Sequence, residues 1–195
     1  RNDQHPLQAT RTAWGMMQAL KQLNGLWQAK GLPELGMRIG VNSGRVVAGN
    51  MGTSTLFNYT IMGDCVNLGA RLESANKFYG THIMVGESTA QHVMNEFALR
   101  LLDKVTVKGK VEPIQIYELM GPRNEVSQQQ LSLRDDYEKT LQAYFNGDFS
   151  DALSGFQKLQ AQFDDPPSKT MLKRCQYYLE HPPENWQGIF NWQKK

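Results

Sequence analysis

Asn67 and Arg71 stand out because their types and spacing suggest chemistry. They are four residues apart in a segment with a helical apolar pattern, so a helix would place an amide and a permanent cation side by side. Apolar residues take up much of the rest of that helix, namely Val66, Leu68, Ala70, Leu72 and Ala75. Such a pair favours an anionic ligand. The alternative is a surface helix whose arginine is merely solvated.

The elements that would position this pair can be read from residue types. A strand-like run at residues 56–62 turns at Gly63 and Asp64 into a helix that we expect to end near Tyr79, because Gly80 suits the position after a helix. A long helix is expected at residues 5–30 and a short one at 88–95. Strands are expected at residues 37–42, 82–85, 98–107 and 112–119, with another starting at 45. This alternation predicts an α/β or α+β fold with helices on one face of a sheet.

Residues 44–49 have the form G-x-x-x-x-G but lack the Lys-Ser/Thr ending that a phosphate-binding P-loop needs. We therefore interpret this stretch as part of a β-hairpin.

The chain changes character after Gly121 and Pro122, which divides it into residues 1–122 and 123–195. Residues 128–130 are expected to be a polar linker and 131–145 a helix. Residues 146–167 resemble a tetratricopeptide unit, with residues at the usual offsets of that repeat in Gly147, Ala152, Phe156 and Pro166. A third helix is expected at 169–179. One such unit cannot bury its own apolar face, so it must dock on the first part, a partner protein or another copy. The aromatic stretch 182–192 is expected to pack as an irregular tail, with a partner anchor as the alternative.

Composition limits the function classes. The net charge of +2 does not suggest a nucleic-acid binder, and no apolar run is long enough to span a membrane. Cys65 and Cys175 are too far apart in sequence for a metal motif, so we expect neither a disulfide framework nor structural zinc, and a cytoplasmic location. The first residue is Arg1, so we interpret the sequence as a piece of a longer chain. An N-terminal membrane anchor in that longer chain stays open.

Two ordered stretches, residues 37–52 (MRIGVNSGRVVAGNMG) and 57–77 (FNYTIMGDCVNLGARLESANK), together with VKGKVEPIQIYEL at 107–119, resemble the second half of a class III nucleotide cyclase catalytic domain. The helical tail is similar to one found after bacterial cyclases of this family. The resemblance implies an N-terminally truncated, ferredoxin-like (βαββαβ) α+β domain that works as a head-to-tail homodimer, followed by the α-helical, tetratricopeptide-like segment.

The resemblance also implies roles for individual residues. Asn67 would orient the ribose of ATP, and Arg71 would stabilise charge on the phosphates in the transition state. Thr60 would read the purine and favours ATP, since its hydroxyl can accept from an adenine amino group. Lys108 or Lys110 would contact the terminal phosphates. Alone, Thr60 could be an ordinary strand residue and the lysines an ordinary charged hairpin.

The family's metal-binding aspartates would lie before residue 1, so a Mg²⁺ or Mn²⁺ pair would have its ligands outside this chain, and no metal role is given to any residue here. We therefore expect the longer protein to be an adenylate cyclase in cyclic AMP signalling and this piece alone to be inactive. The alternatives are a non-catalytic nucleotide-binding or protein-interaction module and a guanylate cyclase.

Overall fold

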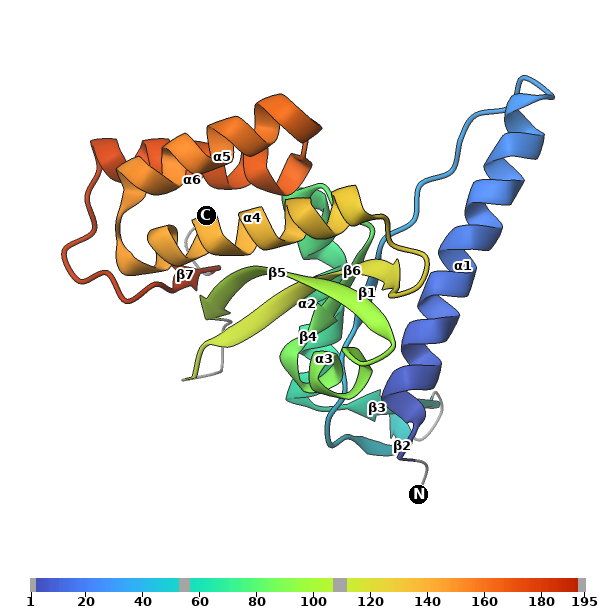
Figure 1. Cartoon of the computed structure of the whole chain (residues 1–195). Coiled ribbons are helices and arrows are strands. Elements are labelled where there is room, and N and C mark those ends of the chain that lie inside the picture. The colour runs from blue at the N-terminus through green and yellow to red at the C-terminus, as the bar shows by residue number, and fades with distance from the viewer. Residues whose placement is uncertain (1–2, 53–56, 107–111, 193–195) are drawn as a thin grey trace.

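A computed structural model describes the chain except residues 1–2, 53–56, 107–111 and 193–195. Six helices are found in the described part (Figure 1), namely α1 (His5–Gln28), α2 (Asp64–Tyr79), α3 (Glu87–Val93), α4 (Gln128–Asn146), α5 (Phe149–Phe163) and α6 (Pro166–Glu180). The strands are β1 (Ile39–Val41), β2 (Val47–Gly52), β3 (Phe57–Met62), β4 (Ile83–Gly86), β5 (Phe97–Thr106), β6 (Ile114–Pro122) and β7 (Phe190–Asn191). The expected α+β class is confirmed.

Five strands form the main sheet in the order β1-β4-β6-β5-β7, and β2 and β3 form a separate antiparallel hairpin. Strand β1 runs parallel to β4, whereas β6 is antiparallel to both β4 and β5. The G-x-x-x-x-G stretch does contribute to a hairpin, but its partner is β3. The strand expected at 37–42 does not pair with β2. Its neighbour in the sheet is β4, which follows β2, β3 and α2 in the sequence.

Helices cover both faces of the main sheet, so the expectation of helices on one face was wrong. The evidence is in β4, whose four residues are all buried. Met84 packs in a cluster with residues of α2, α4, α5 and α6, whereas its neighbours Ile83 and Val85 pack in a second cluster with residues of α1 and α3. Successive strand residues point to opposite faces, so two-sided cover is what an all-apolar strand of this kind indicates.

Helix α4 begins earlier than expected. Gln128 is its first residue, and Ser127 caps it in a capping box with Gln130. The Ser127 hydroxyl accepts from the Gln130 amide, and the Gln130 side chain accepts from the Ser127 amide. The polar linker expected at 128–130 is therefore wrong, because these glutamines form the exposed first turn of a helix.

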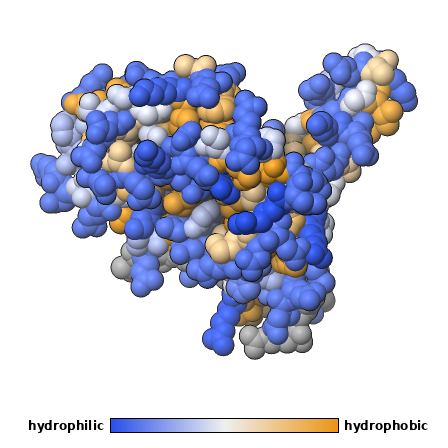
Figure 2. Space-filling model, in the orientation of Figure 1, coloured by the Kyte–Doolittle hydropathy of each residue, from blue (hydrophilic) through white to orange (hydrophobic). Residues whose placement is uncertain are grey.

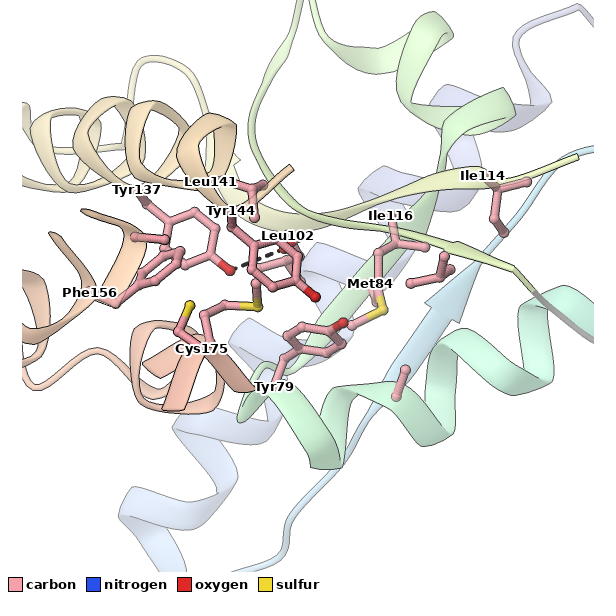
Figure 3. Packing of buried hydrophobic residues seen from close by; sticks show 14 of the residues in the cluster. Tyr79, Met84, Leu102, Ile114, Ile116, Tyr137, Leu141, Tyr144, Phe156 and Cys175 are labelled. Atoms are coloured by element: carbon pink, nitrogen blue, oxygen red, sulfur yellow. Dashed lines mark hydrogen bonds between the residues drawn. The ribbon is translucent and has the colours of Figure 1, made fainter. Parts of the chain in front are cut away.

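The helical segment docks on the cyclase-like part of the same chain, one of the three alternatives raised by its sequence. Figure 3 shows Tyr137, Leu141 and Tyr144 of α4 lying against Leu102 of β5, with Tyr79 of α2 close by. The Tyr137 hydroxyl donates to the Leu102 carbonyl at 3.1 Å. Residues of both parts thus belong to one buried cluster. The tetratricopeptide character of α5 and α6 stays a prediction.

The C-terminal stretch is more ordered than an irregular tail. Phe190 and Asn191 extend the main sheet by pairing with β5 in parallel. Trp186 packs edge-on against Tyr144, with ring centroids 5.1 Å apart, and its indole N–H donates to the Tyr144 carbonyl at 3.0 Å. The aromatic residues here serve the protein's own core.

The C-terminal half of α1 projects from the body of the molecule (Figures 1 and 2). Leu23 and Leu26 on this half are exposed, as are Leu32 and Leu35 in the following loop. Within the part of the chain that the structure describes, no helix has the length and apolar character needed to cross a membrane.

Candidate active site

Helix α2 carries the Asn67–Arg71 pair. Asn67 is exposed and Arg71 is half-buried. The residues that directly follow them in the sequence, Leu68 and Leu72, are buried. The two polar residues are one turn apart, which is about 6 Å along the helix axis. Because the apolar side of the helix is fixed against the sheet, the amide and the guanidinium are presented together on its open side.

The position of α2 depends on a close approach to β1. A β-carbon at Gly40 would lie 2.2 Å from the backbone oxygen of Gly69 and 2.4 Å from the nitrogen of Glu73, so only glycine allows this contact. Asn76 is fully buried, and its amide donates to the Ile39 carbonyl at 3.0 Å. Its own oxygen accepts from Thr81 at 2.8 Å. This satisfied buried amide fixes the helix against the strand.

The start of α2 is fixed by the segment after β1. The Asn42 side chain donates to the Cys65 carbonyl at 2.9 Å, and Ser88 of α3 donates to Asn42 at 3.1 Å. Gly63 precedes the helix with φ of 154°, and a β-carbon there would lie 3.0 Å from the Arg45 oxygen. The turn into α2 therefore needs glycine on both steric and conformational grounds.

The remaining predicted site residues lie elsewhere. Thr60 is an exposed residue of β3, paired in register with Gly49 of β2, and it precedes the first residue of α2 by four positions. Lys108 and Lys110 lie outside the described residues. Strands β5 and β6 on either side of them pair antiparallel, as expected for a hairpin.

A buried cluster of charged residues lies at the C-terminal end of α2 and was not predicted from the sequence. Arg174 of α6 pairs with Asp103 of β5, and the Tyr79 hydroxyl donates to Asp103 at 2.6 Å. Burial raises the pKa of Tyr79 well above 10, and the Asp103 charge adds to this rise, while Arg174 opposes it. Tyr79 therefore stays a donor. The available signal was Arg100 and Asp103, which with Lys104 are the charged residues of a mostly apolar strand.

Arg100 forms a second buried cluster on the same strand. Its guanidinium donates to Glu118 of β6 at 2.5 Å and to Asp165, which caps α6, at 2.8 Å. These residues line one side of a pocket of about 880 Å³ whose other side is the C-terminal half of α1. Asn67, Arg71 and Thr60 are not among its lining residues, so the pocket is separate from the predicted site.

Metal ligands were not expected here. In the described residues, no group of three or more His, Cys, Asp or Glu side chains could hold a metal ion.

Known proteins of one family match this chain. Residues 1–121 match the model of the adenylate and guanylate cyclase catalytic domain, which is more than half of the sequence. The chain belongs to this cyclase family.

Two curated relatives and one solved structure illustrate the similarity. The adenylate cyclase of Anabaena cylindrica is 40% identical over 111 residues, covering 53% of this chain and 22% of that protein. Adenylate cyclase 1 of Rhizobium meliloti is 34% identical over 117 residues, covering 60% and 18%. The crystal structure of the guanylyl cyclase Cya2 is 29% identical with a TM-score of 0.52, covering 65% of this chain and 63% of that one. The chain thus spans about a fifth of the length of these two curated relatives.

Proposed function

We propose that this chain is part of an adenylate cyclase that converts ATP into cyclic AMP and pyrophosphate. The observation that carries the proposal is the placing of Asn67 and Arg71 one turn apart on the open side of α2, within a chain of the cyclase family. The names of the Anabaena and Rhizobium relatives support ATP as the substrate.

The chemistry suits these two side chains. In the reaction the ribose 3′-hydroxyl releases its proton to the surrounding water and its oxygen attacks the α-phosphorus. The bond from that phosphorus to the bridging oxygen breaks, and pyrophosphate leaves with the electron pair. Arg71 is a fixed cation that stabilises the charge moving onto the phosphates without rearranging. Asn67 holds the ribose so that the attacking oxygen is in line.

Thr60 and the lysines complete the proposed substrate site. Thr60 is solvent-exposed on β3, so its hydroxyl is accessible to a ligand and can accept a hydrogen bond from an adenine amino group. Lys108 or Lys110 is proposed to contact the terminal phosphates. The Mg²⁺ or Mn²⁺ pair implied by the family is proposed to be held by aspartates upstream of residue 1.

We also propose a homodimer formed through the cyclase part. The β2–β3 hairpin is separate from the main sheet and exposes large apolar side chains, with Val47 at 68%, Tyr59 at 76%, Ile61 at 49% and Met62 at 56%. An isolated two-stranded hairpin is only marginally stable, so a second copy packed on this face would support it. A cytoplasmic location of this part and a protein partner for the outer face of the helical segment also stay proposals.

A guanylate cyclase is the second candidate. The similarity to the guanylyl cyclase Cya2 supports it, since the two folds match with a TM-score of 0.52. The two candidates share Asn67 and Arg71 and differ in the purine.

The test is production of cyclic nucleotide by the longer purified protein with Mn²⁺ and either ATP or GTP. We expect cyclic AMP from ATP, little cyclic GMP, and no product from the isolated 195-residue chain. Preferential cyclic GMP production would support the second candidate. Absence of both products from the longer protein would refute cyclase activity, and metal-dependent cyclic AMP from the isolated chain would refute the proposed upstream ligands.

A further inference from the structure

The last turn of α2 is tied to helix α6 through a buried cluster. Tyr79, Asp103 and Arg174 are exposed by 0%, 0% and 6%. Besides its pairing with Asp103, Arg174 donates to the Tyr79 hydroxyl at 3.2 Å. Its guanidinium carbon lies 3.6 Å from the centre of the Phe190 ring, which covers the cluster from the C-terminal stretch. The helical segment thus contacts the end of α2 through the charged, hydrogen-bonded side chain of Arg174.

Backbone contacts reinforce this tie. The Thr170 hydroxyl of α6 donates to the Phe78 carbonyl at 2.9 Å. A β-carbon at Gly80, where φ is 69°, would lie 2.5 Å from the Pro166 side chain. The first turns of α6 therefore rest directly on the backbone that ends α2.

The proposed catalytic pair lies between two fixed points on one helix. The hydrogen bond from Asn42 to the Cys65 carbonyl holds one end, and α6 holds the other. Asn67 and Arg71 precede Tyr79 by 12 and 8 residues, or about 18 and 12 Å along the axis. A helix is stiff over this length, so a tilt at Tyr79 moves both side chains.

We infer that α6 is a positioning element for the active site, and that Tyr79, Thr170 and Arg174 are positioning residues that set the orientation of α2. The inference rests on the proposed function, because it concerns the placement of Asn67 and Arg71. It extends that function to α6, which lies outside residues 1–121, the part that matches the cyclase family. The helical segment is then required for full turnover as part of the catalytic framework.

Tyr79→Phe tests this with a matched control, Tyr137→Phe. Both tyrosines are fully buried and both hydroxyls make hydrogen bonds, but the Tyr137 hydroxyl donates to β5 and not toward α2. In the longer protein we expect Tyr79→Phe to lower kcat about tenfold, with KM for ATP changed less than about twofold, because misplacement acts on the transition state. Tyr137→Phe is expected to change both by less than about twofold. Equal loss of kcat in the two variants would overturn the inference.

A second measurement does not depend on turnover. Hydrogen exchange of the α2 amides in the 195-residue chain is expected to speed up in Tyr79→Phe and in Thr170→Val. It should not change in Tyr137→Phe or in Thr140→Val, whose hydroxyl donates to the Asp136 carbonyl within α4 at 2.8 Å. Unchanged exchange in both test variants would overturn the positioning role. If the wild-type longer protein makes no cyclic nucleotide, the proposed function fails, and exchange still decides whether α6 holds α2.

Discussion

Individual side chains in this protein have sharply different burial according to their task. Asn67, which we propose to bind the ribose, is exposed, whereas Asn76, nine residues later on the same helix, is fully buried with its amide and oxygen both hydrogen bonded. An exposed asparagine costs little, while a buried one is tolerated only when it is satisfied. The same residue type is therefore open to solvent at the proposed site and fixes the helix against the sheet at the other position.

Arg71→Ala tests the residue on which the proposed chemistry depends most. We expect turnover in the longer protein to fall by about 100-fold, because one preorganised transition-state donor is removed. The control is Lys77→Ala, which removes an exposed cation from the last turn of the same helix and should leave turnover unchanged. Measurement is by initial rates of cyclic AMP formation, and an Arg71→Ala variant as active as wild type would refute the assigned role.

Buried tyrosines predict loss of stability at alkaline pH. Burial raises the pKa of Tyr79 and Tyr137 well above 10.0. In the unfolded chain these phenols ionise near pH 10, so above that pH the folded state binds more protons. The free energy of unfolding should therefore be fully retained below about pH 10 and fall above it.

Urea unfolding at several pH values, with phenolate absorbance recorded in parallel, measures this effect. The fall should be smaller in Tyr79→Phe and in Tyr137→Phe. A free energy of unfolding that is constant through the alkaline range would contradict the assignment.

At the scale of elements, the contact between β1 and α2 contains two glycines that differ in the space available for a β-carbon. Gly40 faces backbone atoms of α2 within 2.4 Å of where a β-carbon would stand. For Gly69 on α2, the nearest such contact is Asn42 Cβ at 4.0 Å. The first glycine is required by packing, and the second is a helix residue with room beside it.

Gly40→Ala and Gly69→Ala should thus change stability in opposite directions. We expect Gly40→Ala to lower the free energy of unfolding by about 1–3 kcal/mol, because backbone atoms must move. Gly69→Ala should raise it by about 1 kcal/mol through helix propensity. Gly15→Ala, in α1 with nothing within 4 Å, is a control that should also stabilise. Chemical denaturation measures all three, and a neutral Gly40→Ala would show that the contact is looser than described.

At the scale of the molecule, the cyclase part and the helical segment share one buried cluster. Met84 of β4 and Tyr79 of α2 belong to the same cluster as Phe156 of α5 and Cys175 of α6 (Figure 3). A shared core links the stability of its parts, because opening one exposes apolar surface of the other. Detaching the segment would therefore expose apolar side chains of α2, β4 and β5.

Cooperative unfolding follows from the shared core, and Cys175 reports on it. Burial raises the pKa of this thiol to about 12. The native thiol is thus both covered and protonated, and we expect it to react with a thiol reagent only on unfolding. In urea, Cys175 labelling in a Cys65→Ser background should share one midpoint with the loss of helical circular dichroism. Labelling at clearly lower urea would mean that α6 detaches separately.

Local patterns in the sequence were sufficient for most elements. Helix α2 ends at Tyr79 before Gly80 as expected, because a C-terminal glycine acts within a few residues. The expectation at 128–130 failed because the polarity of three glutamines does not exclude a helix, which glutamine favours, and the cap at Ser127 starts the helix there. The positions of Asn67, Arg71 and Thr60 on their elements were also predictable, since they depend on motifs along the chain.

The sequence by itself determined the family, the α+β class and the pairing of Asn67 with Arg71 on one helix, because each depends on nearby residues or ordered motifs. Only the tertiary structure decided that β1 pairs with β4, that helices cover both faces of the sheet, and that α6 closes on the end of α2. These features depend on contacts such as that of Asp103 with Arg174, 71 residues apart. A charge such as Asp103 in a mostly apolar strand is visible in the sequence, but the identity of its distant partner is not, so folding of the whole chain is needed to bring the two together.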